Sequence, residues 1–162
     1  MCSLCENNDI VFLQETWLAE DELALLSNVS KKHYAKGVSS MDPTYCVHTG
    51  RPYGGIAILW KKFISPSCNI ITFDNEKRLM AIEVMLGGRK TVLINAYLPY
   101  CSDENLADYL FYLSKINNLM EFSDTPYVLA AGDFNADRSN QHRFGRELIQ
   151  FCTEENLKKI LF

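Results

Sequence analysis

Short apolar runs, each closed by polar residues, recur along the chain. The runs that have the length of β-strands are residues 10–13, 54–60, 69–73, 79–86, 91–97 and 127–131. Most of them are continuously apolar rather than alternating, which is typical of strands that are covered on both faces. Gly87-Gly88 separates two of the runs and predicts a tight hairpin between them.

Helical periodicity falls between these runs. Residues 20–28 open with acidic side chains, as the first turns of helices often do. A longer helix is expected over residues 103–122, capped by Ser102 or Asp103, and a third over residues 144–157. Strands that alternate with helices predict an α/β fold of layered sheets with helices outside. The whole chain, residues 1–162, is expected to form one domain.

Polar residues stand directly after several of the predicted strands. Glu15 follows the first run, Asp133 follows the last, and Asn95 and Tyr97 end the run before that one. Asn135 points to the same side as Asp133 if the backbone between them stays extended. Side chains at strand ends often carry chemistry, because a rigid backbone holds them at the edge of a cleft.

The chemistry of this set depends on whether Glu15 and Asp133 meet. Two carboxylates about 4 Å apart repel each other by a few kcal/mol at an effective dielectric constant near 20. A proton or a cation must then accompany the pair, and Mg²⁺ (or Mn²⁺) suits such an oxygen-rich site. The alternative for each residue taken alone is a solvated carboxylate at a strand end. Gly132 allows the backbone before Asp133 to turn or to approach another strand closely.

The charge balance limits how the chain can bind nucleic acid. It carries 16 Lys and Arg against 20 Asp and Glu, a formal net charge of −4. This balance argues against tight, unspecific DNA binding by global attraction, but it is compatible with a nuclease whose acidic residues hold a cation. The apolar runs are too short for a membrane span and no signal peptide is evident, so an intracellular protein, nuclear or cytoplasmic, is expected.

Four local strings carry a family resemblance. In chain order they are Leu13-Gln14-Glu15-Thr16-Trp17, Gly54-Gly55-Ile56-Ala57-Ile58-Leu59, Asn95-Ala96-Tyr97-Leu98-Pro99 and Gly132-Asp133-Phe134-Asn135-Ala136. Together they resemble the endonuclease/exonuclease/phosphatase superfamily, which has the DNase I-like fold. The strings look most similar to the apurinic-type endonuclease domains of non-LTR (LINE-like) retrotransposons. The resemblance implies a four-layer α/β sandwich with the active site at one end of the paired sheets.

The resemblance also implies roles for individual residues. Glu15 looks like the metal-binding glutamate, and Asp133 looks like the aspartate that orients or deprotonates the attacking water. Asn135 looks like its partner at the phosphate, and Tyr97 looks like the phenol that supports the scissile phosphate. The implied reaction is metal-dependent hydrolysis of a DNA phosphodiester with Mg²⁺, or Mn²⁺, as cofactor. Asn95 and Arg138 are further candidates for substrate contact, Arg138 through a phosphate; for Arg138 the alternative is a solvated loop.

Two parts of the family pattern are not found in these residues. The family also uses an Asn on a strand before the first one here, and a Ser-Asp-His sequence near the end of the domain. We therefore expect the domain to be truncated at both ends, within an element whose full length can include a fused reverse transcriptase. A catalytically inactive remnant, or a phosphatase of the same superfamily, remains the alternative function. Trp17 and Trp60 flank strand ends; core packing is expected of both, with stacking on bases as the alternative.

Overall fold

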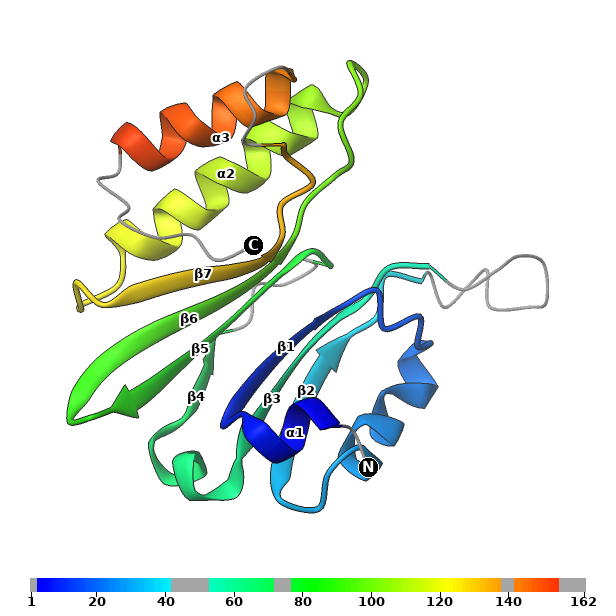
Figure 1. The fold of residues 1–162 in the computed structure, drawn as a ribbon, viewed down its shortest axis with the longest axis vertical. Helices are drawn as coiled ribbons and strands as arrows, with labels where there is room; N and C mark the ends of the chain where they lie inside the picture. Colours follow the sequence, from blue (N-terminus) through cyan, green and yellow to red (C-terminus); the bar gives the residue numbers. More distant parts are fainter. Residues whose placement is uncertain (1–2, 42–52, 72–76, 138–141, 155–162) are drawn as a thin grey trace.

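The computed structural model describes residues 3–41, 53–71, 77–137 and 142–154 as four layers (Figure 1). Helices α2 (Leu106–Glu121) and α3 (Arg143–Glu154) cover one face of a four-stranded sheet. The other face of that sheet packs against a three-stranded sheet. The short helix α1 (Ser3–Asn7) and the 3₁₀ helix η1 (Glu20–Asn28) lie on its outer side. This arrangement confirms the predicted layered α/β class.

Both sheets are built mainly from antiparallel neighbours. The three-stranded sheet has the order β1-β3-β2, with bounds Ile10–Gln14 for β1, Ile56–Lys61 for β3 and His33–Val38 for β2. The four-stranded sheet has the order β4-β5-β6-β7, with bounds Asn69–Ile71, Leu79–Leu86, Arg89–Tyr97 and Val128–Asp133. Leu86 pairs with Arg89, so the predicted Gly87-Gly88 hairpin is confirmed. Only β6 and β7 run parallel among the described strand pairs.

The sequence pattern missed one strand and misjudged one side chain. Strand β2 lies at the edge of its sheet and is only partly apolar, so it does not form the continuous run by which the other strands were found. A second 3₁₀ helix, η3 (Lys62–Ser67), links β3 to β4. Trp60 is buried in the core as expected, with 6% of its surface exposed. Trp17 is 42% exposed, so the expectation of core packing is wrong for that residue.

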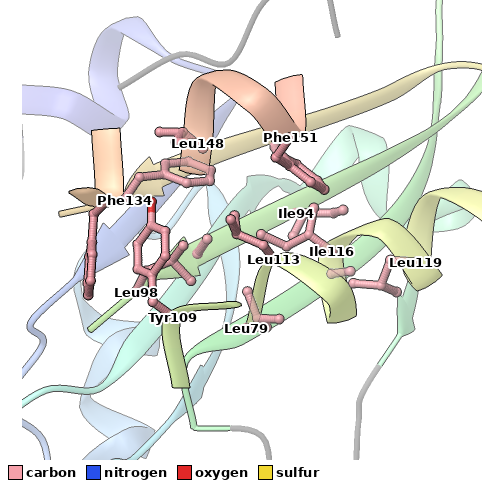
Figure 2. Close-up of a cluster of buried hydrophobic side chains, with 14 of the residues drawn as sticks. Leu79, Ile94, Leu98, Tyr109, Leu113, Ile116, Leu119, Phe134, Leu148 and Phe151 are labelled. Atoms are coloured by element: carbon pink, nitrogen blue, oxygen red, sulfur yellow. The ribbon is translucent and has the colours of Figure 1, made fainter. Parts of the chain in front are cut away.

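The continuous apolar runs are explained by burial on both faces. The two sheets share one core between them, and the four-stranded sheet has a second core on its other face. Between the sheets, Ile56 and Ile58 of β3 pack with Met80 and Ile82 of β5 and with Leu93 of β6. On the far side of the four-stranded sheet, side chains of α2 and α3 meet over Ile94 and Leu98 (Figure 2). Successive side chains of one strand thus enter different cores, and a strand buried on both faces needs apolar residues at every position. None of the described helices has the length and apolar character needed to cross a membrane.

A close backbone contact fixes the end of the parallel pair β6–β7. Gly132 pairs with Ala96 and has a φ of 141°, a region that favours glycine. A Cβ atom on Gly132 would clash with the carbonyl oxygen of Ala96, which is backbone and cannot rotate away. The absence of a side chain at Gly132 therefore allows Asp133, the next residue, to stand beside the end of β6.

We expect Gly132→Ala to destabilise the protein strongly. Backbone strain contributes about 1–3 kcal/mol, and the clash with Ala96 adds to it. Gly88→Ala is the matched control, because Gly88 also has a positive φ, 76°, but its new Cβ would meet no atom within 4 Å. Thermal or urea denaturation should show a loss of about 1–2 kcal/mol in the control and a clearly larger loss in Gly132→Ala. Equal losses in the two variants would contradict the close approach.

Candidate active site

Three of the residues singled out from the sequence meet where β1, β6 and β7 end. Tyr97 is the last residue of β6, and its partner across the parallel pair is Asp133, the last residue of β7. Register partners share a face of the sheet, and here it is the face toward the other sheet, since Tyr97 and Leu129 pack there. From that other sheet, Glu15 follows β1, and its Oε1 accepts a hydrogen bond of 2.6 Å from the Tyr97 hydroxyl. Asp133 acts electrostatically on Tyr97 as well, so both carboxylates lie near one phenol.

Tyr97 is held in place by a cation as well as by Glu15. The Nη1 of Arg78 donates to the Tyr97 carbonyl oxygen at 3.2 Å, and the guanidinium lies 5.2 Å from the centre of the Tyr97 ring. Burial, and after it the hydrogen bond to Glu15, raises the pKa of Tyr97 to about 12. Tyr97 thus remains a neutral hydrogen-bond donor at physiological pH.

A buried phenylalanine anchors the segment that carries Asp133 and Asn135. Phe134 lies between them and is 1% exposed, within the core under the helices. The backbone amide of Asn135 donates to Oδ1 of Asp133 at 2.9 Å, and its side-chain amide donates to the carbonyl oxygen of Leu98 at 2.8 Å. These bonds fix the orientation of both polar side chains. Among the described residues, no partner is found for the second hydrogen of the Asn135 amide, which can serve a ligand.

Backbone strain is concentrated in this region. Among the described residues, the non-glycine residues with positive φ are Glu15 at 53°, Trp17 at 55° and Asn135 at 48°. Such conformations cost about 1–3 kcal/mol each and cluster at functional sites, where surrounding structure compensates for them. All three residues belong to the two strings that carry the carboxylates.

The Gly54-Gly55 pair supplies that compensation on the β1 side. The backbone amide of Trp17 donates to the Gly54 carbonyl oxygen at 2.9 Å, and that of Thr16 donates to the Gly55 carbonyl oxygen at 3.2 Å. Gly54 has a φ of 62°, and a Cβ there would lie 2.7 Å from Oγ of Ser40. The glycines before β3 therefore hold the loop after Glu15 in its left-handed conformation.

Asn95 lies elsewhere than the sequence suggested. It is completely buried between the sheets, and its Nδ2 donates to the carbonyl oxygens of Leu13 at 3.0 Å and of Ala57 at 2.9 Å. Its Oδ1 accepts from the side-chain amide of Gln14. The amide is thus fully used within the protein, and this placement does not fit the expected contact with substrate. Asn95 instead joins β6 to β1 and β3, directly beneath Glu15 and Tyr97.

We expect Asn95→Asp to destabilise the protein by about 3 kcal/mol or more. The carboxylate has the same shape as the amide, but it sets an acceptor against two carbonyl oxygens that lose their donor, and it buries a charge. Asn118→Asp, at an exposed position on α2, is the matched control and should stay within about 0.5 kcal/mol of the unchanged protein. Urea denaturation of the two variants measures the difference. A mild effect at Asn95 would show that its amide does not hold the sheets together.

The site opens to solvent through two neighbouring hollows. A pocket of about 590 Å³ has Glu15, Tyr97 and Arg78 in its wall. A second pocket, of about 420 Å³, is lined by Gln14, Gly132, Asp133, Phe134, Asn135, Ala136 and Asp137. Gln14 precedes Glu15 and Asp133 is the register partner of Tyr97, so the two pockets lie on either side of the same strand ends.

The donor set fits a hard divalent cation held by few protein ligands. Glu15 is exposed, and within the described part of the chain its carboxylate accepts one side-chain hydrogen bond, from Tyr97, which leaves acceptor positions for a cation. Mg²⁺ commonly binds through one or two carboxylates and completes its shell with water and substrate phosphates. Within the described residues, no group of three or more His, Cys, Asp or Glu could hold a metal by itself. The arrangement therefore suits a magnesium site that is completed by substrate, not a closed structural metal site.

Two polar residues of the site were not expected from the sequence. The side chain of Gln14 donates to Asn95, and that of Arg78 donates to the Tyr97 carbonyl oxygen. Gln14 ends β1 and Arg78 precedes β5, positions that many other polar residues of the chain share. The signal for Gln14 was its place in the Glu15 string; Arg78 had none. Arg138, the expected phosphate contact, lies outside the described residues.

Paired sheets with carboxylate, amide and phenol groups at one end define a class of layered α/β proteins with an oxygen-rich site. The chain belongs to the Endonuclease/Exonuclease/phosphatase family, whose sequence profile matches residues 1–151. This membership confirms the superfamily to which the four strings pointed. The family generally uses a divalent metal ion such as Mg²⁺. No curated protein matches the chain.

Solved structures support the same fold at low sequence identity. A truncated TDP2 from Caenorhabditis elegans is 24% identical with a TM-score of 0.54, and the match covers 86% of this chain and 55% of that one. The catalytic domain of human Nocturnin with bound sulfate is 16% identical with a TM-score of 0.58, covering 94% and 58%. The 3′ phosphatase NExo from Neisseria, bound to a product DNA hairpin, is 16% identical with a TM-score of 0.60, covering 94% and 63%. The chain thus spans little more than half the length of these proteins.

Proposed function

We propose that the chain carries the metal-dependent site of a phosphodiesterase that acts on DNA. The observation that carries this proposal is the hydrogen bond from Tyr97 to Glu15, together with the register that sets Asp133 beside Tyr97. This arrangement brings together the exposed carboxylate of Glu15, which can hold a cation, and the carboxylate of Asp133, which can hold a water. The neutral side chains of Tyr97 and Asn135 nearby can donate to a phosphate. Left-handed backbone at Glu15 and Asn135 supports a functional origin for the arrangement.

Each side chain has a role that its surroundings support. Glu15 holds the divalent ion, which, when bound, polarises a phosphate oxygen and stabilises the departing oxyanion. Asp133 orients the attacking water and accepts its proton, while the Asn135 backbone amide fixes the carboxylate through Oδ1. The Asn135 side-chain amide donates to an oxygen of the phosphate as negative charge grows there. The Tyr97 hydroxyl does the same once its single hydrogen turns from Glu15 to the phosphate. Arg78 positions Tyr97 through a hydrogen bond to its carbonyl oxygen and a cation–π contact with its ring.

The DNA substrate and the retrotransposon type rest on the sequence strings. The Asn95-Ala96-Tyr97-Leu98-Pro99 string and the residues after Asp133 look more like those of nucleases than those of sugar-phosphate or lipid phosphatases. NExo, which has the same fold, was solved with a product DNA hairpin. We therefore propose a DNA endonuclease of the kind found in non-LTR retrotransposons, in which a reverse transcriptase can follow in the same polypeptide.

Glu15→Gln and Asp133→Asn should each lower Mg²⁺-dependent nicking of supercoiled plasmid by about 10²-fold or more. The first change removes the charge that holds the cation, and the second removes the group that accepts a proton from water. Both replacements keep the size of the side chain, so circular dichroism should show an unchanged fold. Conversion of supercoiled to open-circular DNA, followed with Mg²⁺ and with EDTA, gives the rate.

Glu121→Gln is the matched control, because Glu121 is an exposed carboxylate at the end of α2 that lines neither pocket of the site. Mn²⁺ binding, measured by calorimetry, gives a second readout without turnover. Affinity should fall about tenfold or more in Glu15→Gln and stay the same in Glu121→Gln. Nicking and Mn²⁺ affinity that are unaffected by Glu15→Gln would rule out the assigned role.

A further inference from the structure

The larger pocket of the site extends well beyond the catalytic groups. Its volume is about 590 Å³, within the range of ordinary ligand sites. Glu15 and Tyr97 form one part of its wall, and Trp17, Tyr53, Tyr100 and Lys77 belong to the rest. The mechanism proposed above needs only Glu15, Tyr97 and Arg78 among these residues. The other side chains therefore require a separate explanation.

Three aromatic rings of the pocket are exposed although they come from different parts of the chain. Trp17 follows β1 and is 42% exposed, Tyr53 precedes β3 and is 61% exposed, and Tyr100 follows β6 and is 67% exposed. Exposed aromatic side chains that gather beside a polar site are typical of ligand-binding surfaces. Their rings suit a flat, uncharged ligand that can stack.

The wall that carries Trp17 is rigid before any ligand arrives. The Trp17 backbone amide is bonded to the Gly54 carbonyl oxygen, and the amide of Gly55 donates to Oγ of Ser40 at 2.8 Å. On the other side, Nζ of Lys77 donates to the Ser40 carbonyl oxygen at 3.4 Å. A preformed pocket loses little conformational entropy on binding, which favours a defined ligand.

The charges around the pocket indicate what the flat ligand is attached to. Lys77 and Arg78 line it in a chain whose net charge is −4. Cations next to stacking rings are the pattern by which proteins hold single-stranded nucleic acid, since the cations meet the backbone and the rings meet the bases. In a paired helix the base faces are covered by their neighbours, so rings can reach them only on a base that has left the stack.

We propose that Trp17, Tyr53 and Tyr100 form a subsite for an unpaired DNA base next to the phosphate bound by Glu15 and Tyr97. The inference rests on the proposed function and specifies its substrate as DNA with an unpaired or extruded nucleotide beside the cleavage site. Stacking is tolerant of base identity, because every base has an aromatic face. The subsite therefore selects DNA structure, not DNA sequence.

The test measures DNA binding in EDTA, where no cleavage occurs. The probes are a short single-stranded oligodeoxythymidylate and a blunt duplex of the same length. Trp17 reports directly, because Trp60, the other tryptophan, is only 6% exposed. We expect the single strand to quench the tryptophan fluorescence and to bind about tenfold more tightly than the duplex. Trp17→Ala should weaken single-strand binding about tenfold, while Trp17→Phe keeps most of it. Because these two variants lack the Trp17 fluorophore, their affinities are measured by the fluorescence anisotropy of a dye-labelled oligonucleotide.

Phe122→Ala is the matched control, because Phe122 is an aromatic residue that is 87% exposed and lies at the far end of α2. It should not change either affinity. If Trp17→Ala does not fold, Tyr53→Ala and Tyr100→Ala decide, each with a several-fold loss for the single strand alone. Equal affinities for the two probes, or ring variants that bind the single strand like the unchanged protein, would overturn the subsite. Because Glu15→Gln nicking is measured separately, such a result would leave the proposed function standing.

Discussion

The side chain of Asn95 joins three strands from two sheets through bonds that use its whole amide. Its donors reach the carbonyl oxygens of Leu13 and Ala57, and its acceptor receives the side chain of Gln14. Asn95 itself is completely buried, and loss of its donor would leave the carbonyl oxygens of Leu13 and Ala57 without this partner. Apolar packing is non-directional, whereas these hydrogen bonds require particular partners at particular positions. The Asn95 amide ties β6 to the end of β1 in the other sheet. This link holds Glu15, which follows β1, beside Tyr97, which ends β6.

The backbone around the site is strained on both sides of the joined strands. Glu15, Trp17 and Asn135 adopt left-handed conformations that residues with side chains usually avoid. Backbone hydrogen bonds to the carbonyl oxygens of Gly54 and Gly55 on one side, and the buried ring of Phe134 on the other, compensate for the strain. The carboxylates, the Tyr97 phenol and the exposed aromatic rings are therefore already positioned before a ligand binds. Preorganisation of this kind is what stabilisation of a charged transition state requires.

Much of the fold could be predicted because continuous apolar runs reflect burial on both faces. The pattern failed at β2, an edge strand that is only partly apolar, and at Trp17, whose apolar ring gave no sign of exposure. For the site, the strand ends located Glu15, Tyr97 and Asp133, since a polar residue after an apolar run stands out. Asn95 stood out for the same reason, yet its role depends on contacts with Leu13 and Ala57 that are distant in sequence. Arg78 could not have been found from the sequence, because its role depends on its contact with the Tyr97 ring, which is distant in sequence.

We propose that side chains that follow or end β1, β6 and β7 surround one cation-binding position. Paramagnetic line broadening by Mn²⁺ in an amide-resolved NMR spectrum tests it most directly in a protein of 18.5 kDa. As Mn²⁺ is added, signals from Glu15, Tyr97 and Asp133 should broaden together, while those of Lys90 and Phe122 at the opposite end of the sheet remain sharp. Glu15→Gln should abolish the effect at all three positions. Broadening that affects Glu15 but spares Asp133, or that survives Glu15→Gln, would contradict the shared site.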